Sequence, residues 1–139
     1  CAFGIEGYEG RIYIVNGPIS GEFDLGDADT IFEGENEDSY AGRAVSNTGD
    51  VNNDGYDDIL INAQGEDRDG EEDKYTYLIL GPADEGTVNL SDADVLFIGG
   101  GWSLSFAGDI NFDGYDDFII GPGYGDEVLS IIYGREITE

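Results

Sequence analysis

The stretch Asp50-Val51-Asn52-Asn53-Asp54-Gly55-Tyr56-Asp57-Asp58 decides how this chain folds, and it recurs as Asp109-Ile110-Asn111-Phe112-Asp113-Gly114-Tyr115-Asp116-Asp117. In both copies, side chains that carry oxygen stand at loop positions 1, 3, 5 and 9, and glycine stands at position 6. Alternate side chains can then point inward around a hard cation, while glycine adopts the backbone conformation of a tight turn. Each copy runs directly into an apolar stretch, residues 59–61 or 118–120. The pattern predicts two Ca²⁺ loops, each joined to a β-strand.

Other loop types agree less well with this stretch. An EF-hand or dockerin-type loop needs a carboxylate at position 12 and a helix after it. Position 12 is Ile61 in the first copy and Ile120 in the second, and both lie in expected strands. The alternative is an Asx-rich turn without metal. A second matched copy of the loop makes this alternative weaker than it would be for a single copy. The position-8 carboxylates, Asp57 and Asp116, are expected to face away from the ion.

The charge of the chain excludes two classes of partner. The 139 residues contain 32 acidic and five basic side chains, which gives a formal net charge of −27. Five scattered cations cannot form the basic patch that nucleic acid binding requires, and direct binding to an anionic membrane is excluded for the same reason. Two bound Ca²⁺ ions would offset little of this charge, so salt or further cations must screen the rest.

The single cysteine, Cys1, rules out an intrachain disulfide. A cysteine at the first position fits a bacterial lipoprotein, in which a lipid anchor is attached to the residue that follows the removed signal peptide. It fits equally well a fragment that happens to begin there. Ca²⁺ loops of this kind suit an extracellular or cell-surface location, where millimolar Ca²⁺ is available even to weak sites.

Short apolar or alternating runs, separated by Gly, Pro, Asp and Asn, predict an all-β fold of about nine strands. No window has convincing helical periodicity. The segments 21–29 and 83–94 are predicted to be linkers. The expected strands are residues 11–17, 30–32, 41–48, 58–63, 74–81, 95–99, 103–107, 117–121 and 128–134.

These strands form a repeat. The two loops begin 59 residues apart, at Asp50 and Asp109, and the segment 89–99 (NLSDADVLFIG) resembles 24–34 (DLGDADTIFEG). Each unit has four antiparallel strands, which is typical of a β-propeller blade or a related open array. We expect a partial unit at 1–36, a full unit at 37–99 and a unit lacking its last strand at 100–139, all in one continuous β-domain.

The loops, the strands DDILINA and DDFIIGP that follow them, and the aromatic strands resemble FG-GAP repeats of integrin α-subunit propellers and their bacterial relatives. The resemblance covers nearly the whole chain. The Phe-Gly start of the repeat is altered to Tyr40-Ala41-Gly42 and Gly100-Gly101-Trp102, which leaves the loops intact. The resemblance implies at least two Ca²⁺ ions, held by loop side chains 1, 3, 5 and 9 and by the carbonyl at position 7. The implied ligands are Asp50, Asn52, Asp54, Tyr56 and Asp58 in the first loop, and Asp109, Asn111, Asp113, Tyr115 and Asp117 in the second.

Weaker signals concern the remaining acidic residues. The acidic loop 66–73 lacks a ligand spacing and is expected to be solvated. The Asp-Ala-Asp segments 27–29 and 92–94 recur with the unit, which raises a structural or interfacial role, with Ca²⁺ between neighbours, as the less favoured alternative. The chain has no His, no Cys pair and no serine in a nucleophile-elbow context, and its many carboxylates make any pairing uninformative. We expect no enzyme activity, no catalytic residues and no cofactor site besides the metal.

The number of strands leaves the array open. Closed propellers contain about four to eight blades, whereas this chain offers two strands, a unit of four, and three strands of another unit. Unfinished units expose sheet edges, which can pair with a neighbouring molecule. We therefore expect a Ca²⁺-stabilised structural protein, secreted or surface-anchored, whose copies associate into a homo-oligomer or filament, either a closed ring or an extracellular fibre. The alternative is a fragment of an integrin-like adhesion propeller that binds an extracellular protein or glycan ligand.

Overall fold

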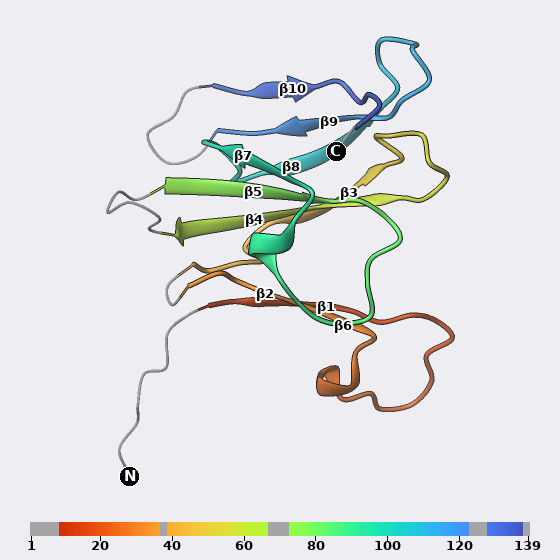
Figure 1. Cartoon of the computed structure of the whole chain (residues 1–139), viewed down its shortest axis with the longest axis vertical. Helices are drawn as coiled ribbons and strands as arrows, with labels where there is room; N and C mark the ends of the chain where they lie inside the picture. Colours follow the sequence, from red (N-terminus) through yellow and green to blue (C-terminus); the bar gives the residue numbers. More distant parts are fainter. Residues whose placement is uncertain (1–8, 37–38, 67–72, 123–127, 138–139) are drawn as a thin grey trace.

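The computed structural model describes residues 9–36, 39–66, 73–122 and 128–137 (Figure 1). Within them the chain has two short 3-10 helices, η1 (Leu25–Asp27) and η2 (Leu90–Asp92). The strands are β1 (Arg11–Ile14), β2 (Thr30–Glu33), β3 (Val45–Gly49), β4 (Asp58–Glu66), β5 (Asp73–Ile79), β6 (Gly86–Asn89), β7 (Val95–Ile98), β8 (Leu104–Gly108), β9 (Asp117–Ile120) and β10 (Ser130–Ile132).

The strands form three separate sheets that follow one another along the long axis of the molecule (Figure 1). Their strand orders are β1-β2-β6, β3-β4-β5-β7 and β10-β9-β8. All pairings within the last two sheets are antiparallel. No sheet closes on itself within the described residues. The prediction of an all-β chain of antiparallel, blade-like sheets in an open array is confirmed.

One strand and one pairing were not foreseen. β6 lies in the segment 83–94 that was expected to be a linker, and it pairs in parallel with β2 of the preceding sheet, with Phe32 opposite Val88. The prediction that this segment is only a linker is therefore wrong for residues 86–89. The reason is that the free edge of β2 needs hydrogen-bonding partners, and a chain that crosses from one sheet to the next can supply them.

The starts of two strands also differ from expectation. β3 begins at Val45 rather than at residue 41, because Tyr40 and Gly42 have positive φ angles of 48° and 86°. Glycines 99–101 likewise have positive φ angles immediately before β8. Residues in this left-handed region cannot continue an extended strand. The small residues of these segments thus shape turns rather than strands.

The middle sheet is buried on both faces. Along β4, Ile61 and Ala63 belong to one apolar cluster, which includes Phe32 and Leu90 from the first sheet and its covering turn. Leu60, the residue before Ile61, belongs to a second cluster shared with the third sheet. Successive side chains of a strand point to opposite faces, so a strand between two layers buries residues on both faces and is apolar at successive positions. This explains the apolar run Ile59-Leu60-Ile61, while the buried Asn62 that follows donates to the Tyr75 carbonyl at 3.0 Å.

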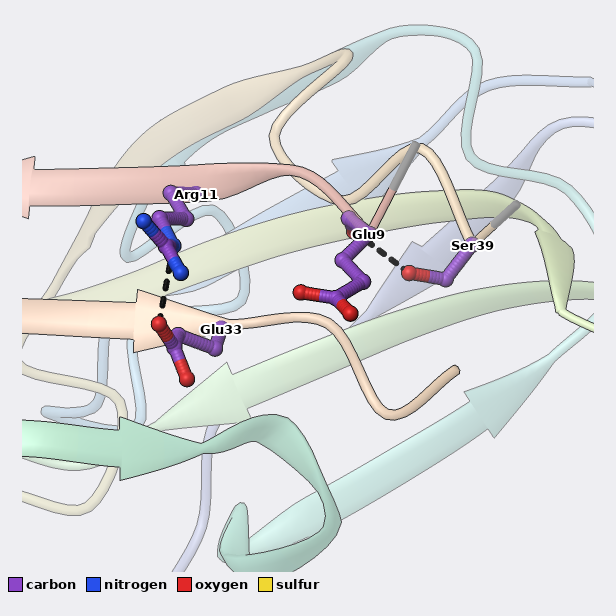
Figure 2. Close-up of polar contacts among 4 residues, drawn as sticks. All are labelled: Glu9, Arg11, Glu33 and Ser39. Atoms are coloured by element: carbon purple, nitrogen blue, oxygen red, sulfur yellow. Dashed lines mark hydrogen bonds and ion pairs between the residues drawn. The ribbon is translucent and has the colours of Figure 1, made fainter. Parts of the chain in front are cut away.

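Polar contacts tie the first sheet together and to the segment that leads into the middle sheet (Figure 2). Arg11 Nε lies 2.8 Å from Glu33 Oε1, across the β1–β2 pair. The buried Ser39 donates its hydroxyl to the carbonyl oxygen of Glu9 at 2.5 Å, and the Ala41 amide donates to the same oxygen. The chain that leaves β2 is thereby held against the start of β1.

Candidate metal centres

The first aspartate loop is organised by its own side chains. Asp50 accepts hydrogen bonds from the amides of Asp54 and Gly55, at 2.9 and 2.8 Å. Asn52 Oδ1 also accepts from the Asp54 amide, at 3.1 Å, and Asp54 Oδ1 accepts from the Tyr56 amide, at 2.9 Å. Short polar side chains favour such turns because they replace backbone acceptors locally. The side chains at positions 1, 3 and 5 therefore shape one turn.

The second loop repeats this arrangement bond for bond. Asp109 accepts from the amides of Asp113 and Gly114, at 3.1 and 2.9 Å. Asn111 Oδ1 accepts from the Asp113 amide and Asp113 Oδ1 from the Tyr115 amide, at 3.1 and 3.0 Å. The two stretches, which differ only at positions 2 and 4, thus reach the same local structure.

The backbones of the two loops match as well. Position 6 is a glycine with φ of +94° in both, and position 4 lies in the left-handed region, with φ of 58° at Asn53 and 63° at Phe112. Asparagine tolerates this region better than most residues, whereas a bulky side chain such as phenylalanine rarely adopts it. The loop geometry is therefore kept even where the residue at position 4 does not favour it.

The position-9 carboxylates, Asp58 and Asp117, are fully buried and join the loop to the rest of the sheet. Asp58 accepts from the amides of Val51 and Gly81, at 2.8 and 2.9 Å. Asp117 accepts from those of Ile110 and Gly134, both at 2.9 Å. Each carboxylate thus connects the start of its loop to the turn after the neighbouring strand, β5 or β10.

The surroundings of Asp58 disfavour its negative charge. Burial raises the pKa of Asp58 above its usual value, and the nearby charges of Asp54 and Asp50 raise it further, while the two amide hydrogen bonds act in the opposite direction. A carboxylate that is buried beside two others is costly to ionise unless a cation is present. The loop therefore concentrates more negative charge than its hydrogen bonds offset.

The position-8 side chains face away from their own loops, as predicted, but they differ in what they contact. Asp57 Oδ2 accepts from Asn47 Nδ2 at 3.2 Å. Asp116 Oδ2 instead accepts from the Asp50 amide at 3.0 Å, and the Asp116 amide donates to the Asp50 carbonyl at 3.1 Å. The second loop is therefore bonded to the first residue of the first loop. Sequence analysis missed this link, although an aspartate at position 8 of both copies was a signal for it.

The donors of both loops suit Ca²⁺ in kind. They are carboxylate, amide and carbonyl oxygens, the hard ligands that this ion prefers. Within the residues that the structure describes, no three Asp, Glu, His or Cys side chains are grouped closely enough to hold a metal ion. The carboxylates are bonded to loop amides, yet each oxygen keeps a second lone pair. The residues therefore fit Ca²⁺ by the chemistry of their donors.

The Asp-Ala-Asp segments have a structural role. Asp29 accepts from the Asn16 amide at 2.7 Å, and the equivalent Asp94 accepts from the Leu80 amide at 2.8 Å. The first bond ties the start of β2 to the end of β1, and the second ties the start of β7 to the end of β5. The core of the acidic loop, residues 67–72, and the proposed anchor residue Cys1 lie outside the described residues.

The fold and the loops define a class: an all-β protein of blade-like units, whose aspartate loops stand before the second strand of a unit. Residues 41–88 match the family model of the FG-GAP repeat. The chain is also 37% identical over 105 residues to integrin alpha-PS2 of Drosophila melanogaster, an alignment that covers 68% of this chain. The chain therefore carries FG-GAP repeats of the integrin α type. It spans about 7% of the length of that curated relative. No helix in the described part of the chain is long and apolar enough to cross a membrane.

Proposed function

We propose that this chain is a Ca²⁺-stabilised segment of an integrin-like adhesion propeller, located outside the cell or at its surface, and that it binds an extracellular protein or glycan ligand. One observation carries the proposal: two loops with the same hydrogen bonds each connect neighbouring strands of a blade-like sheet. The similarity to an integrin alpha subunit supports the adhesive role. The units at 1–36, 37–99 and 100–139 are proposed as successive repeats, and catalysis is not part of the function.

The proposed ligands are the loop side chains at positions 1, 3, 5 and 9 and the carbonyl at position 7. They are Asp50, Asn52, Asp54, Tyr56 and Asp58, and Asp109, Asn111, Asp113, Tyr115 and Asp117. When bound, Ca²⁺ would neutralise the clustered carboxylates and so couple metal binding to folding. The raised pKa of Asp58 supports this, because its charge is poorly compensated without a cation. The position-9 carboxylates then stabilise the sheet, because each connects its loop, which joins two strands, to the turn after a third strand.

Isothermal titration with Ca²⁺ tests the proposal, up to about 10 mM because extracellular sites bind at roughly 10⁻⁴–10⁻³ M. Asp54→Asn and Asp113→Asn keep an oxygen that can accept the amide bond of Tyr56 or Tyr115 but remove the charge. We expect two sites in the natural protein and one in either variant. Asp57→Asn is the matched control, since its side chain contacts Asn47 rather than its own loop. The absence of binding heat, together with the same Tm in Ca²⁺ and in chelator, would refute the metal sites.

A second candidate is self-association of copies into a homo-oligomer or filament. A specific observation favours it: within the described residues β7 stands at the edge of the middle sheet, whereas β2 is flanked by β1 and β6. Edges of this kind pair readily with another chain.

A further inference from the structure

We infer that Ca²⁺ binding at the two loops is positively coupled, and that Asp116 of the second loop positions the first loop for its ion. The inference rests on the proposed Ca²⁺ sites and adds to them a contact between two units of the repeat. Asp116 stands at position 8, between the proposed ligands Tyr115 and Asp117, and its side chain faces away from its own loop. It is therefore a positioning residue for the neighbouring loop rather than a ligand in its own.

Asp116 holds the backbone of Asp50, the first proposed ligand of the first loop, through two hydrogen bonds. Its Oδ2 accepts from the Asp50 amide at 3.0 Å, and its own amide donates to the Asp50 carbonyl at 3.1 Å. The carboxylate of Asp50 points into its own loop, where it accepts from the amides of Asp54 and Gly55. The second loop thus fixes the main chain of Asp50, while the side chain of Asp50 serves the first loop.

The contact is close enough to require a glycine before Asp50. A Cβ on Gly49 would lie 2.1 Å from Asp116 Oδ2 and 2.7 Å from Asp116 Cγ, and Gly49 is itself buried. Gly108 precedes the second loop with almost the same φ, 69° against 70° at Gly49. A Cβ on Gly108 would meet only Phe106 Cζ, at 3.9 Å. Gly49 therefore leaves the space that the Asp116 carboxylate occupies.

A second connection joins position 9 of the second loop to position 2 of the first loop. The Gly134 amide donates to Asp117 Oδ1 at 2.9 Å, and the next amide, that of Arg135, donates to the Val51 carbonyl at 2.9 Å. Val51 is only 1% exposed, so this contact lies within the core. One turn therefore links the proposed ligand Asp117 to the second residue of the first loop.

These contacts predict that ordering one loop lowers the entropic cost of ordering the other. Tyr115 and Asp117 are proposed ligands on either side of Asp116, so their binding to Ca²⁺ restricts the backbone that holds Asp50. The first loop then loses less conformational freedom when it binds its own ion, which gives positive coupling without a change of structure. Coupling between two binding sites is reciprocal, so the first loop must raise the affinity of the second by the same factor.

Repulsion between two bound cations acts in the opposite direction. Its range is set by the Debye length, which is about 8 Å at physiological salt and about 3 Å at 1 M. The bond between Asp116 and Asp50 is partly buried, and partly buried contacts are screened much less than exposed charges. Coupling through Asp116 should therefore persist at high salt, where the repulsion is small.

Ca²⁺ titration followed by heteronuclear NMR measures the two loops separately. The amides of Gly55 and Gly114 each donate to the first carboxylate of their own loop, so their signals report one loop each. Asp113→Asn removes a charged ligand from the second loop and Asp54→Asn removes one from the first. We expect Asp113→Asn to weaken Ca²⁺ binding at the first loop about fivefold or more, and Asp54→Asn to weaken binding at the second loop by the same factor.

Variants of Asp116 test whether this residue carries the coupling. In an Asp116→Ala background, Asp113→Asn should no longer change the affinity of the first loop beyond the effect of its lost charge, because the bond to Asp50 is gone. Asp116→Asn is the matched control, since it removes the same charge but keeps an oxygen that can accept from the Asp50 amide. We expect Asp116→Asn to retain most of the coupling. A role of Asp116 in stability alone would lower the Tm of Asp116→Ala and leave the ratio of affinities unchanged.

A pair of glycine variants tests the link without altering any charge. Gly49→Ala places a Cβ where the Asp116 carboxylate lies and should reduce the coupling, whereas Gly108→Ala imposes the same backbone strain before the other loop and should retain it. Circular dichroism in chelator verifies that each variant is folded. The two Asp116 variants decide the question if Gly49→Ala does not fold.

The outcomes separate the coupling from the metal sites themselves. If each loop bound Ca²⁺ with an affinity independent of the other loop, the coupling would be wrong while both sites stood. Negative coupling that disappears at 1 M salt would assign the effect to repulsion between cations and overturn the role of Asp116. If neither the Gly55 nor the Gly114 signal responded to Ca²⁺ up to about 10 mM, the proposed sites would be refuted together with the coupling.

Discussion

The loops at residues 50–58 and 109–117 have the same internal hydrogen bonds and the same backbone turns, but they have different surroundings. The second loop uses Asp116 to hold the first residue of the first loop, whereas the side chain of Asp57 in the first loop accepts a hydrogen bond from Asn47 of its own unit. The conformation of each loop is therefore set within nine residues, while its contribution to the stability of the fold depends on its contacts with the neighbouring unit. Differences between matched substitutions can separate these two contributions.

The largest expected effect is common to both loops. Asp58→Ala and Asp117→Ala each leave two backbone amides of the buried region without their acceptor. We expect a loss of about 2–4 kcal/mol in the free energy of unfolding for each variant. Urea unfolding in chelator measures this without a metal contribution. Asp92→Ala, at an exposed position, is the control, and losses below about 1 kcal/mol would contradict the structural role of position 9.

The glycines that precede the loops should respond unequally. Gly49 and Gly108 have φ angles of 70° and 69°, so alanine incurs the same backbone strain, about 1 kcal/mol, at either site. A Cβ on Gly49 would lie 2.1 Å from Asp116 Oδ2 and 2.6 Å from Phe106 Cε2, whereas on Gly108 it meets only Phe106 Cζ at 3.9 Å. We therefore expect Gly49→Ala to lose about 2–3 kcal/mol and Gly108→Ala about 1.

A double variant isolates the cause. In an Asp116→Ala background, the additional cost of Gly49→Ala should shrink, because the nearest atom is removed. Equal costs at Gly49 and Gly108 in unfolding measurements would show that the inter-loop contact adds nothing.

The position-8 carboxylates should differ for the same reason. Asp116→Ala removes the acceptor of the Asp50 amide in the neighbouring unit, and should cost about 1–2 kcal/mol. Asp57→Ala removes an exposed side-chain contact and should stay within about 0.5 kcal/mol of the natural protein. Thermal unfolding of the pair measures the difference. A larger loss of stability in Asp57→Ala than in Asp116→Ala would contradict a stabilising contact between the two loops.

Position 4 offers a stabilising change. Phe112 is 91% exposed with φ of 63°, where the equivalent Asn53 has φ of 58°. Phe112→Asn should raise stability by about 0.5–1 kcal/mol, because asparagine tolerates this conformation and little apolar contact is lost. The reverse change, Asn53→Phe, should lower it by a similar amount. If the Tm of Phe112→Asn were below that of the natural protein, the left-handed backbone at residue 112 would not be a source of strain.

The smallest expected effect is a pH dependence of the unfolding free energy that comes from Asp58 in the first loop, measured in chelator. Because the pKa of Asp58 is raised in the folded state, chiefly by burial, folding favours the protonated form. The stability from this group is complete below the unfolded pKa and is lost as pH rises through the folded pKa. Unfolding free energies measured from pH 4 upward should therefore fall more steeply in the natural protein than in Asp58→Asn. If the unfolding free energies of the natural protein and of Asp58→Asn changed in parallel with pH, Asp58 would not be the source of the pH dependence.

Most of the strand content and the position of both loops could be predicted from local pattern. Apolar runs bounded by Gly and Asp mark β4 and β9, and oxygen donors at alternate positions mark the loops. β6 could not be predicted in the same way, since GTVN is short and only its last two residues are partly buried. It is a strand only because the edge of β2 lies beside it. The role of Asp116 was hidden for a similar reason, because its partner lies 66 residues away.

By itself the sequence determined the local geometry of the two loops and the strands that follow them. The reason is that side-chain oxygens and amides within nine residues satisfy one another, and alternation selects the buried faces. Only the tertiary structure decided which edges are covered and which are free. Leu25 and Leu90 share a sequence pattern, yet one is exposed and the other is in the core. Burial depends on which sheet lies beside a segment, and the chain places a sheet edge beside residues 86–92 and none beside residues 21–27 within the described structure.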